Sequence, residues 1–188
     1  IQTDQTKTAS SKALSLREIL RIKGAPYILI TFFAYSAMET TTGLWASSYL
    51  VQYLLMEPEK AAKFASFFYL GITVGRFLCG FVADRMGDKA LIRLGGGIVG
   101  AGILLVLIPF PVTTPALLGL VIIGFGCAPV YPAIIHSTPF YFGKENSQAL
   151  IGIQMACAYV GSTFMPPLFG TLAARIGIWL YPVFLLVF

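Results

Sequence analysis

The stretch CGFVADRMG, Cys79 to Gly87, ends an uncharged run on an acid, a base and a glycine. A weaker copy, FGTLAARIG, follows 90 positions later, from Phe169 to Gly177. Over residues 69–87 this shift gives eight identities in nineteen positions without a gap, including a tyrosine, a threonine and an arginine. Average residue usage would give about one or two. We interpret the two stretches as copies of an internal repeat; the alternative is that glycine-rich apolar helices resemble one another.

The composition indicates a membrane protein. Of the 188 residues, 57% are hydrophobic and 11% are charged, with a mean hydropathy of +0.80, whereas a soluble domain has about 25% charged residues. A spanning helix needs about 20 mostly apolar residues. Five stretches meet this requirement and a sixth begins near Gly177, so we predict an all-α integral membrane fold of six transmembrane helices. The five lie near 25–55, 64–83, 94–112, 116–137 and 147–169.

The two ends suggest an excerpt of a longer protein. The sequence starts at Ile1 on a polar stretch and stops at Phe188 inside an apolar run, so we expect the sixth helix to be cut. Residues 1–24 have no apolar core of a signal peptide and are interpreted as a cytoplasmic linker and basic preamble. Residues 25–188 are the predicted six-span transmembrane half-domain.

The basic residues predict the orientation. Nine lie on one side of the predicted membrane and three on the other, and the positive-inside rule assigns the larger set to the cytoplasm. We therefore expect a multi-pass protein of the cell (inner or plasma) membrane whose N-terminal end is cytoplasmic, and no nucleic-acid partner despite the net charge of +5. The nine are Lys7, Lys12, Arg17, Arg21, Lys23, Arg85, Lys89, Arg93 and Lys144; the three are Lys60, Lys63 and Arg175.

The repeat predicts an inverted architecture. Three crossings separate the second stretch from the fifth, so the two copies cross the bilayer in opposite directions. We place the inverted repeats at about 25–112 and 116–188. Three-plus-three inverted repeats within a six-span half are a construction principle of secondary transporters.

The first stretch carries an acid near its middle. An ion at Glu39 costs about 2.5 kcal/mol or more in a bilayer, so we expect the carboxylate to face protein or water. At 100° per residue, polar and aromatic side chains share its side of the helix: Tyr35, Thr42, Tyr49 and Tyr53. We interpret these residues as a substrate-cavity wall with Glu39 as a proton carrier; the alternative is a structural glutamate bonded to a neighbouring helix.

The fourth stretch contains GFGCAPVYP, residues 124–132. Proline removes a backbone donor and clashes with the preceding turn, so Pro129 and Pro132 predict a broken helix. Broken helices at membrane depth often line cavities, and Tyr131 joins the candidate cavity residues. The alternative is a kink with a structural role.

Arg76 is the one base deep inside a stretch. Three roles stay open: the side chain extends to the cytoplasmic surface, it pairs with Glu39 or bonds internally, or it binds an anionic substrate group.

The pattern does not favour an enzyme. His136 adjoins Ser137, but neighbouring helical residues point about 100° apart and the Gly-x-Ser-x-Gly elbow is missing. We expect His136 at helix-end carbonyls. The cysteines lie in apolar runs and are interpreted as packing residues, and no disulfide, metal site or cofactor is predicted: Cys79, Cys127 and Cys157.

GFVADRMGDKALIR, residues 80–93, resembles the signature of the major facilitator superfamily between the second and third helices of each half. Gly80, Asp84, Arg85, Gly87 and Lys89 match it, whereas Asp88 occupies a position where a base is usual. GFGCAPVYP and FMPPLFGTLAARIG resemble the tenth and eleventh helices of this superfamily. Residues 39–45 resemble those of fucose-permease-like sugar transporters.

The resemblance implies the C-terminal six-helix half of a secondary active transporter of a small polar solute, working by alternating access, with proton symport as one option. Its partners would be the lipid bilayer, the solute and the missing N-terminal six-helix half. The first and fourth helices would line the cavity, and a cytoplasmic gate would include Asp84, Arg85 and Arg93. The alternatives are a stand-alone half that assembles as a dimer, an intramembrane enzyme, or a scaffold.

Overall fold

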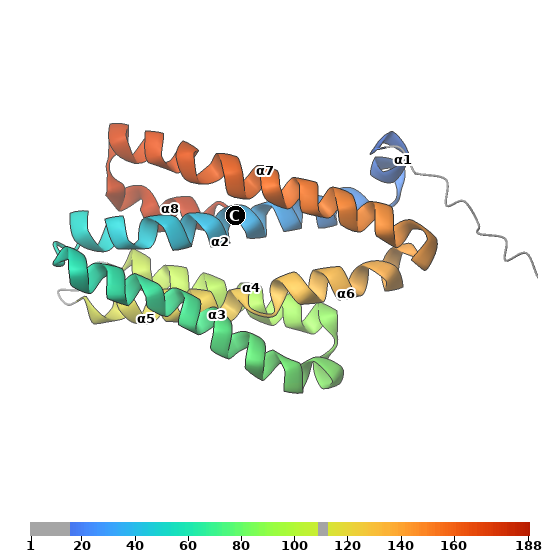
Figure 1. Ribbon diagram of the computed structural model, residues 1–188, viewed down its shortest axis with the longest axis horizontal. Coiled ribbons are helices and arrows are strands. Elements are labelled where there is room, and N and C mark those ends of the chain that lie inside the picture. The colour runs from blue at the N-terminus through green and yellow to red at the C-terminus, as the bar shows by residue number, and fades with distance from the viewer. Residues whose placement is uncertain (1–15, 109–112) are drawn as a thin grey trace, which may run out of the picture.

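The computed structural model describes residues 16–108 and 113–188, apart from the side chains of Leu16 and Asp84. These residues form helices and no strand (Figure 1), so the predicted all-α class is confirmed for them. Lys7, Lys12 and residues 109–112 lie outside the described residues. The elements are α1 Leu16–Arg21, α2 Ala25–Gln52, α3 Pro58–Met86, α4 Asp88–Leu107, α5 Thr114–Cys127, α6 Val130–Phe142, α7 Lys144–Ile176, the 3-10 helix η1 Ile178–Leu180 and α8 Tyr181–Leu186.

Within residues 16–108 and 113–188, four segments are long and apolar enough to cross a membrane: Pro58–Ala83, Asp88–Leu107, Thr114–Phe142 and Lys144–Ile176. α2 has the length, with 28 residues, but its serines, threonines and tyrosines make it more polar, and it is not among the four. The chain is therefore an integral membrane protein by length and composition. The complete six-helix arrangement stays a prediction.

Glycine corners join the helices. Gly87 ends α3 with φ 75° and ψ 155°, and Gly177 ends α7 with φ 129° and ψ 153°. Both lie in the region of positive φ that favours glycine because a Cβ would be strained there. These two glycines are partners in the shift of 90, so both copies end their helix on a glycine at positive φ, although the two φ values differ.

Glycines also set the closest helix contacts. α5 packs against α3 and α4, and α2 packs along α7. A methyl group at Gly71 or Gly75 of α3 would collide with α5, and one at Gly161 of α7 would collide with α2. Small residues allow this close approach in lipid. Gly80 and Gly152 instead face open space, so the tight-packing interpretation holds for only some of the glycines.

The fourth span is broken where the prolines predicted. α5 ends at Cys127, Ala128 and Pro129 form a turn, and α6 starts at Val130. Backbone groups at such a break need partners within the protein. Tyr35 of α2 supplies one, because its hydroxyl donates to the Cys127 carbonyl at 3.2 Å.

The preamble contains a short helix that the sequence interpretation had assigned to a linker. Ile19 of α1 is fully buried in a small cluster with Leu29 and Leu150, while Arg17 and Arg21 are exposed. α1, the α3–α4 corner and the α6–α7 corner lie at one end of the bundle (Figure 1). The basic segments that the structure describes at the predicted cytoplasmic side thus share one end.

Candidate functional site

A cavity of about 770 Å³ lies between α3 and α6, with the start of α4 at one end. Each helix contributes one face, since the lining residues recur at intervals of three and four. Most of their side chains are small, which leaves the space between the helices open. The α3 face consists of Arg76, Cys79, Gly80 and Ala83, and the opposite face of Pro129, Pro132, Ala133 and His136, with Tyr131 beside it.

The cavity exists because α3 separates from the fourth span after the break. Gly71 and Gly75 hold α3 tightly against α5. Beyond Pro129 the chain takes a new direction, and the C-terminal half of α3 diverges from α6 (Figure 1). A methyl group at Gly80 would meet nothing within 4 Å, which matches this separation.

Arg76 marks the inner part of the cavity. It lies 18 residues after the start of α3 and 10 before its end, and its side chain is exposed to the cavity. Among the described residues, no ion pair joins Arg76 to Glu39. Both charges nevertheless act electrostatically on Tyr35 and Cys127 at the break. A charged side chain at membrane depth costs about 2.5–3.5 kcal/mol on insertion scales, so this guanidinium needs water, a ligand or another part of the protein to solvate or pair with it.

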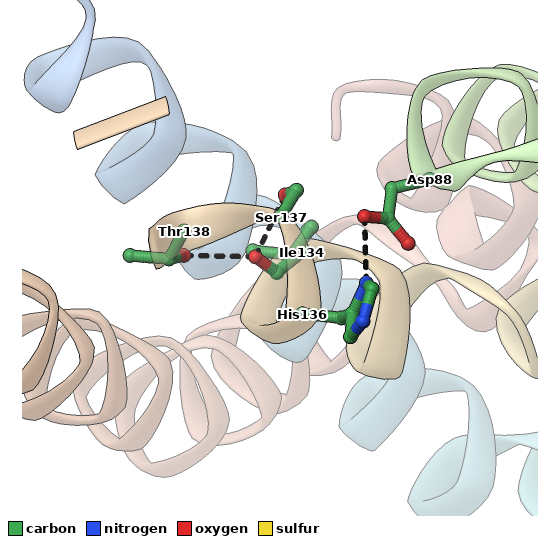
Figure 2. Close-up of polar contacts among 5 residues, drawn as sticks. All are labelled: Asp88, Ile134, His136, Ser137 and Thr138. Atoms are coloured by element: carbon green, nitrogen blue, oxygen red, sulfur yellow. Dashed lines mark hydrogen bonds and ion pairs between the residues drawn. The ribbon is translucent and has the colours of Figure 1, made fainter. Parts of the chain in front are cut away.

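A cross-helix pair lies at the other end. Asp88 begins α4, and its Oδ2 lies 2.8 Å from Nδ1 of His136 on α6 (Figure 2). The Asp88 side chain is 24% exposed and that of His136 is 83% exposed, so the pair contributes at most about 1 kcal/mol. The expected position of His136 at helix-end carbonyls was wrong, because its partner is a carboxylate on another helix.

Ser137 does not form a nucleophile–base pair with its neighbour. Its hydroxyl donates to the Ile134 carbonyl at 2.9 Å, and Thr138 donates to the same oxygen at 2.8 Å. His136 points in a different direction, towards Asp88 (Figure 2). The hydroxyl and the imidazole are thus engaged separately.

The polar and aromatic residues predicted to share one side of α2 differ in their environments. Tyr35, Thr42 and Tyr49 are buried, and their hydroxyls donate to the carbonyls of Cys127, Met38 and Val106 respectively. These bonds hold α2 to its neighbours or remain within α2. We therefore do not count the three residues among those that line the α3–α6 cavity. Tyr53 is 44% exposed and stacks on Tyr49, and Glu39 is half-buried.

Tyr131 is the predicted cavity residue that lies in the same hollow as Arg76. Its ring centroid is 5.2 Å from that of Phe32, and its hydroxyl lies 3.4 Å from the Met155 sulfur. These contacts fix the tyrosine between α2 and α7 while one side lines the cavity.

The sequence model of the family described as the Major Facilitator Superfamily matches residues 27–188 of this chain. The chain belongs to this superfamily.

Three curated relatives are similar over parts of the chain. "Membrane protein MosC" of Rhizobium meliloti is 25% identical over 159 residues, which are 84% of this chain and 39% of MosC. "Enterobactin exporter EntS" of Salmonella choleraesuis (strain SC-B67) is 30% identical over 118 residues, 60% of this chain and 28% of EntS. "Bypass of stop codon protein 6" of Saccharomyces cerevisiae is 35% identical over 68 residues, 36% of this chain and 14% of the yeast protein. The chain thus spans well under half the length of these relatives.

The superfamily signature of this chain lies at the α3–α4 corner. Arg85, Lys89 and Arg93 are exposed there, while the Asp84 side chain lies outside the described residues. Lys89 and Arg93 line a second hollow of about 680 Å³ together with Lys23. The corner thus has two sides: Asp88 lines the α3–α6 cavity, whereas Lys89 and Arg93 line the other hollow.

Sequence reasoning also missed polar links between helices that involve residues outside the polar and aromatic set predicted for α2. Gln154 is fully buried and donates to Thr138 at 3.0 Å, which joins α7 to α6. Trp45 donates to the Pro166 carbonyl at 3.1 Å, which joins α2 to α7. Asp88 of α4 also pairs with His136 of α6. The acid at a signature position where a base is usual was the one sign of this pair in the sequence.

Proposed function

We propose that this chain forms the C-terminal half of a secondary active transporter that moves a small polar solute by alternating access. The observation that carries the proposal is the cavity between α3 and α6 in a member of this superfamily. Its volume of about 770 Å³ falls within the range of about 300–1,000 Å³ of small-molecule sites. EntS is named an enterobactin exporter, and this similarity supports a transport role.

We propose that the two halves of the chain are inverted repeats. Gly71 and Gly161 are partners in the shift of 90, and each makes a backbone-close contact, with α5 and α2 respectively. These two helices begin the second and the first repeat. If the first repeat is exchanged for the second, α3 becomes α7 and α5 becomes α2. The α3–α5 contact then corresponds to the α7–α2 contact, as an inverted repeat requires.

We propose that the α3–α4 corner is a cytoplasmic gate. Asp88 connects α4 to His136 on α6 at the end of the cavity where the basic segments gather. Breaking this contact would let α3 and α4 move away from α6. Asp84, Arg85, Gly87 and Lys89 belong to the same corner, and we assign them to the gate on the family motif.

The coupling role of Glu39 is a separate proposal. This carboxyl group is half-buried in the middle of α2 and lies within electrostatic reach of the helix break. Ionisable side chains in the middle of spanning helices are rare and often belong to proton pathways, and on this ground we assign the proton-carrying role to Glu39.

Transport by the full-length protein tests the function. A thermal-shift screen against sugars, organic acids, phosphate esters and siderophores identifies a solute that binds. Proteoliposomes preloaded with that solute should then show saturable counterflow of its labelled form. Binding without counterflow, while the reconstituted protein remains folded, would contradict the proposed function.

A further inference from the structure

The cavity between α3 and α6 has an asymmetric distribution of charge. Among the described residues that line it, the basic and acidic side chains are Arg76, Asp88 and His136. The last two face each other at 2.8 Å, so each already has a counter-group. Arg76 lies two helical turns or more inside this end and has no acidic partner within 4.0 Å among the described residues.

Neighbouring acids do not supply that partner. Glu39 acts on the same break region but does not line the cavity and forms no ion pair with Arg76. Asp84 lies eight residues further along α3, about 12 Å of helix. Among the described residues the guanidinium therefore has no acidic partner, and it lines a space large enough for a solute.

The walls around Arg76 suit a compact ligand with one charged end. Cys79, Gly80 and Ala83 continue its face of α3, and Pro132 and Ala133 oppose them. None of these side chains carries a charge or a strong donor. A guanidinium presents a planar fork of donors that matches a carboxylate or phosphate group in a bidentate geometry.

We infer that the solute of this cavity is an oxyanion, whose carboxylate or phosphate group binds Arg76 while its body lies between the small-residue faces of α3 and α6. This inference rests on the proposed function for the identity of the cavity. It assigns the substrate class, which neither the family nor the relatives' names determine for this chain. Tyr131 lines the α6 side of the same hollow, with its hydroxyl bonded to the Met155 sulfur.

Ligand-induced stabilisation of the full-length protein in detergent tests the inference. The probes are lactate, succinate and glycerol 3-phosphate, with glucose as a neutral probe of similar size. We expect at least one anion to raise the melting temperature and glucose to have no effect; the carboxylates and the phosphate ester distinguish the two oxyanion types. Arg76→Gln should lower the affinity for that anion by about tenfold or more. Arg76→Lys should lower the affinity by less, because a lysine keeps the charge and loses the bidentate fork.

Lys63→Gln is the matched control, since it removes an exposed base from the other end of the same helix and should leave the anion affinity unchanged. Stabilisation by glucose alone, by none of the anions, or by an anion that binds Arg76→Gln and Arg76→Lys as tightly as the wild type would overturn the inference. Anion binding without counterflow would instead contradict the transport function. Counterflow of a neutral solute without anion binding would leave transport intact and reject the substrate class.

Discussion

The substitution Gly161→Ala tests the helix contact that the repeat architecture requires. A methyl group at this position would lie 2.6 Å from the Phe33 carbonyl oxygen and 3.3 Å from the Ala37 nitrogen. Ordinary contacts begin near 3.4 Å, so α7 and α2 would have to separate by about 0.8 Å. Overpacking of this kind costs about 1–3 kcal/mol.

Gly152→Ala on the same helix is the matched control. Its methyl group would meet nothing within 4 Å. Both substitutions gain about the same helix propensity, up to about 1 kcal/mol, so the difference between the two variants isolates the packing cost of about 1–3 kcal/mol. Urea or thermal unfolding of the purified protein in detergent measures that difference.

The inverted repeat extends the test to Gly71, where the α5 backbone is as close as α2 is to Gly161. Gly71→Ala should therefore be destabilising by a similar or larger amount. If Gly161→Ala and Gly71→Ala were as stable as Gly152→Ala, the close helix contacts and the repeat argument built on them would be refuted.

Three further predictions concern individual contacts. Asp88→Asn should weaken the contact with His136, raise the labelling rate of Cys79 from the cytoplasmic side and lower uptake; unchanged labelling and uptake would reject the gate. Glu39→Gln should abolish proton-driven accumulation while preserving exchange in proteoliposomes, and full accumulation in this variant would reject a coupling role. Trp45→Phe should lower the unfolding free energy by about 0.5–1.5 kcal/mol through loss of its hydrogen bond, whereas an unchanged denaturation midpoint would show that the bond contributes nothing.

Local chemistry made several features predictable from the sequence. Pro129 lacks an amide proton, and this property placed the break between α5 and α6. The backbone at Gly87 has a positive φ, which glycine adopts without strain, so a glycine at the end of an apolar run is typical of a corner. Length and hydropathy were enough for the spanning helices α3, α4 and α7.

Contacts between distant residues were not predictable in this way. Helical periodicity assigned Tyr35 and Tyr49 to one face of α2 but could not tell whether that face meets a cavity or a neighbouring helix. In the structure it meets carbonyls of α5 and α4. His136 and Asp88 are 48 positions apart, and the sequence spacing contains no information about such a pair.

Sided labelling of Cys79 tests the central claim most directly. This cysteine lines the cavity, so we use a full-length variant in which Cys79 is kept and every other cysteine is replaced by serine, including Cys127 and Cys157. The full-length protein is exposed to a membrane-impermeant maleimide in inverted and in right-side-out vesicles. The account predicts labelling of Cys79 from the cytoplasmic face in inverted vesicles, and a change in its rate when the transported solute is added. Labelling only from the outer face, or a rate that no bound solute alters, would contradict a cytoplasmic cavity that opens and closes during transport.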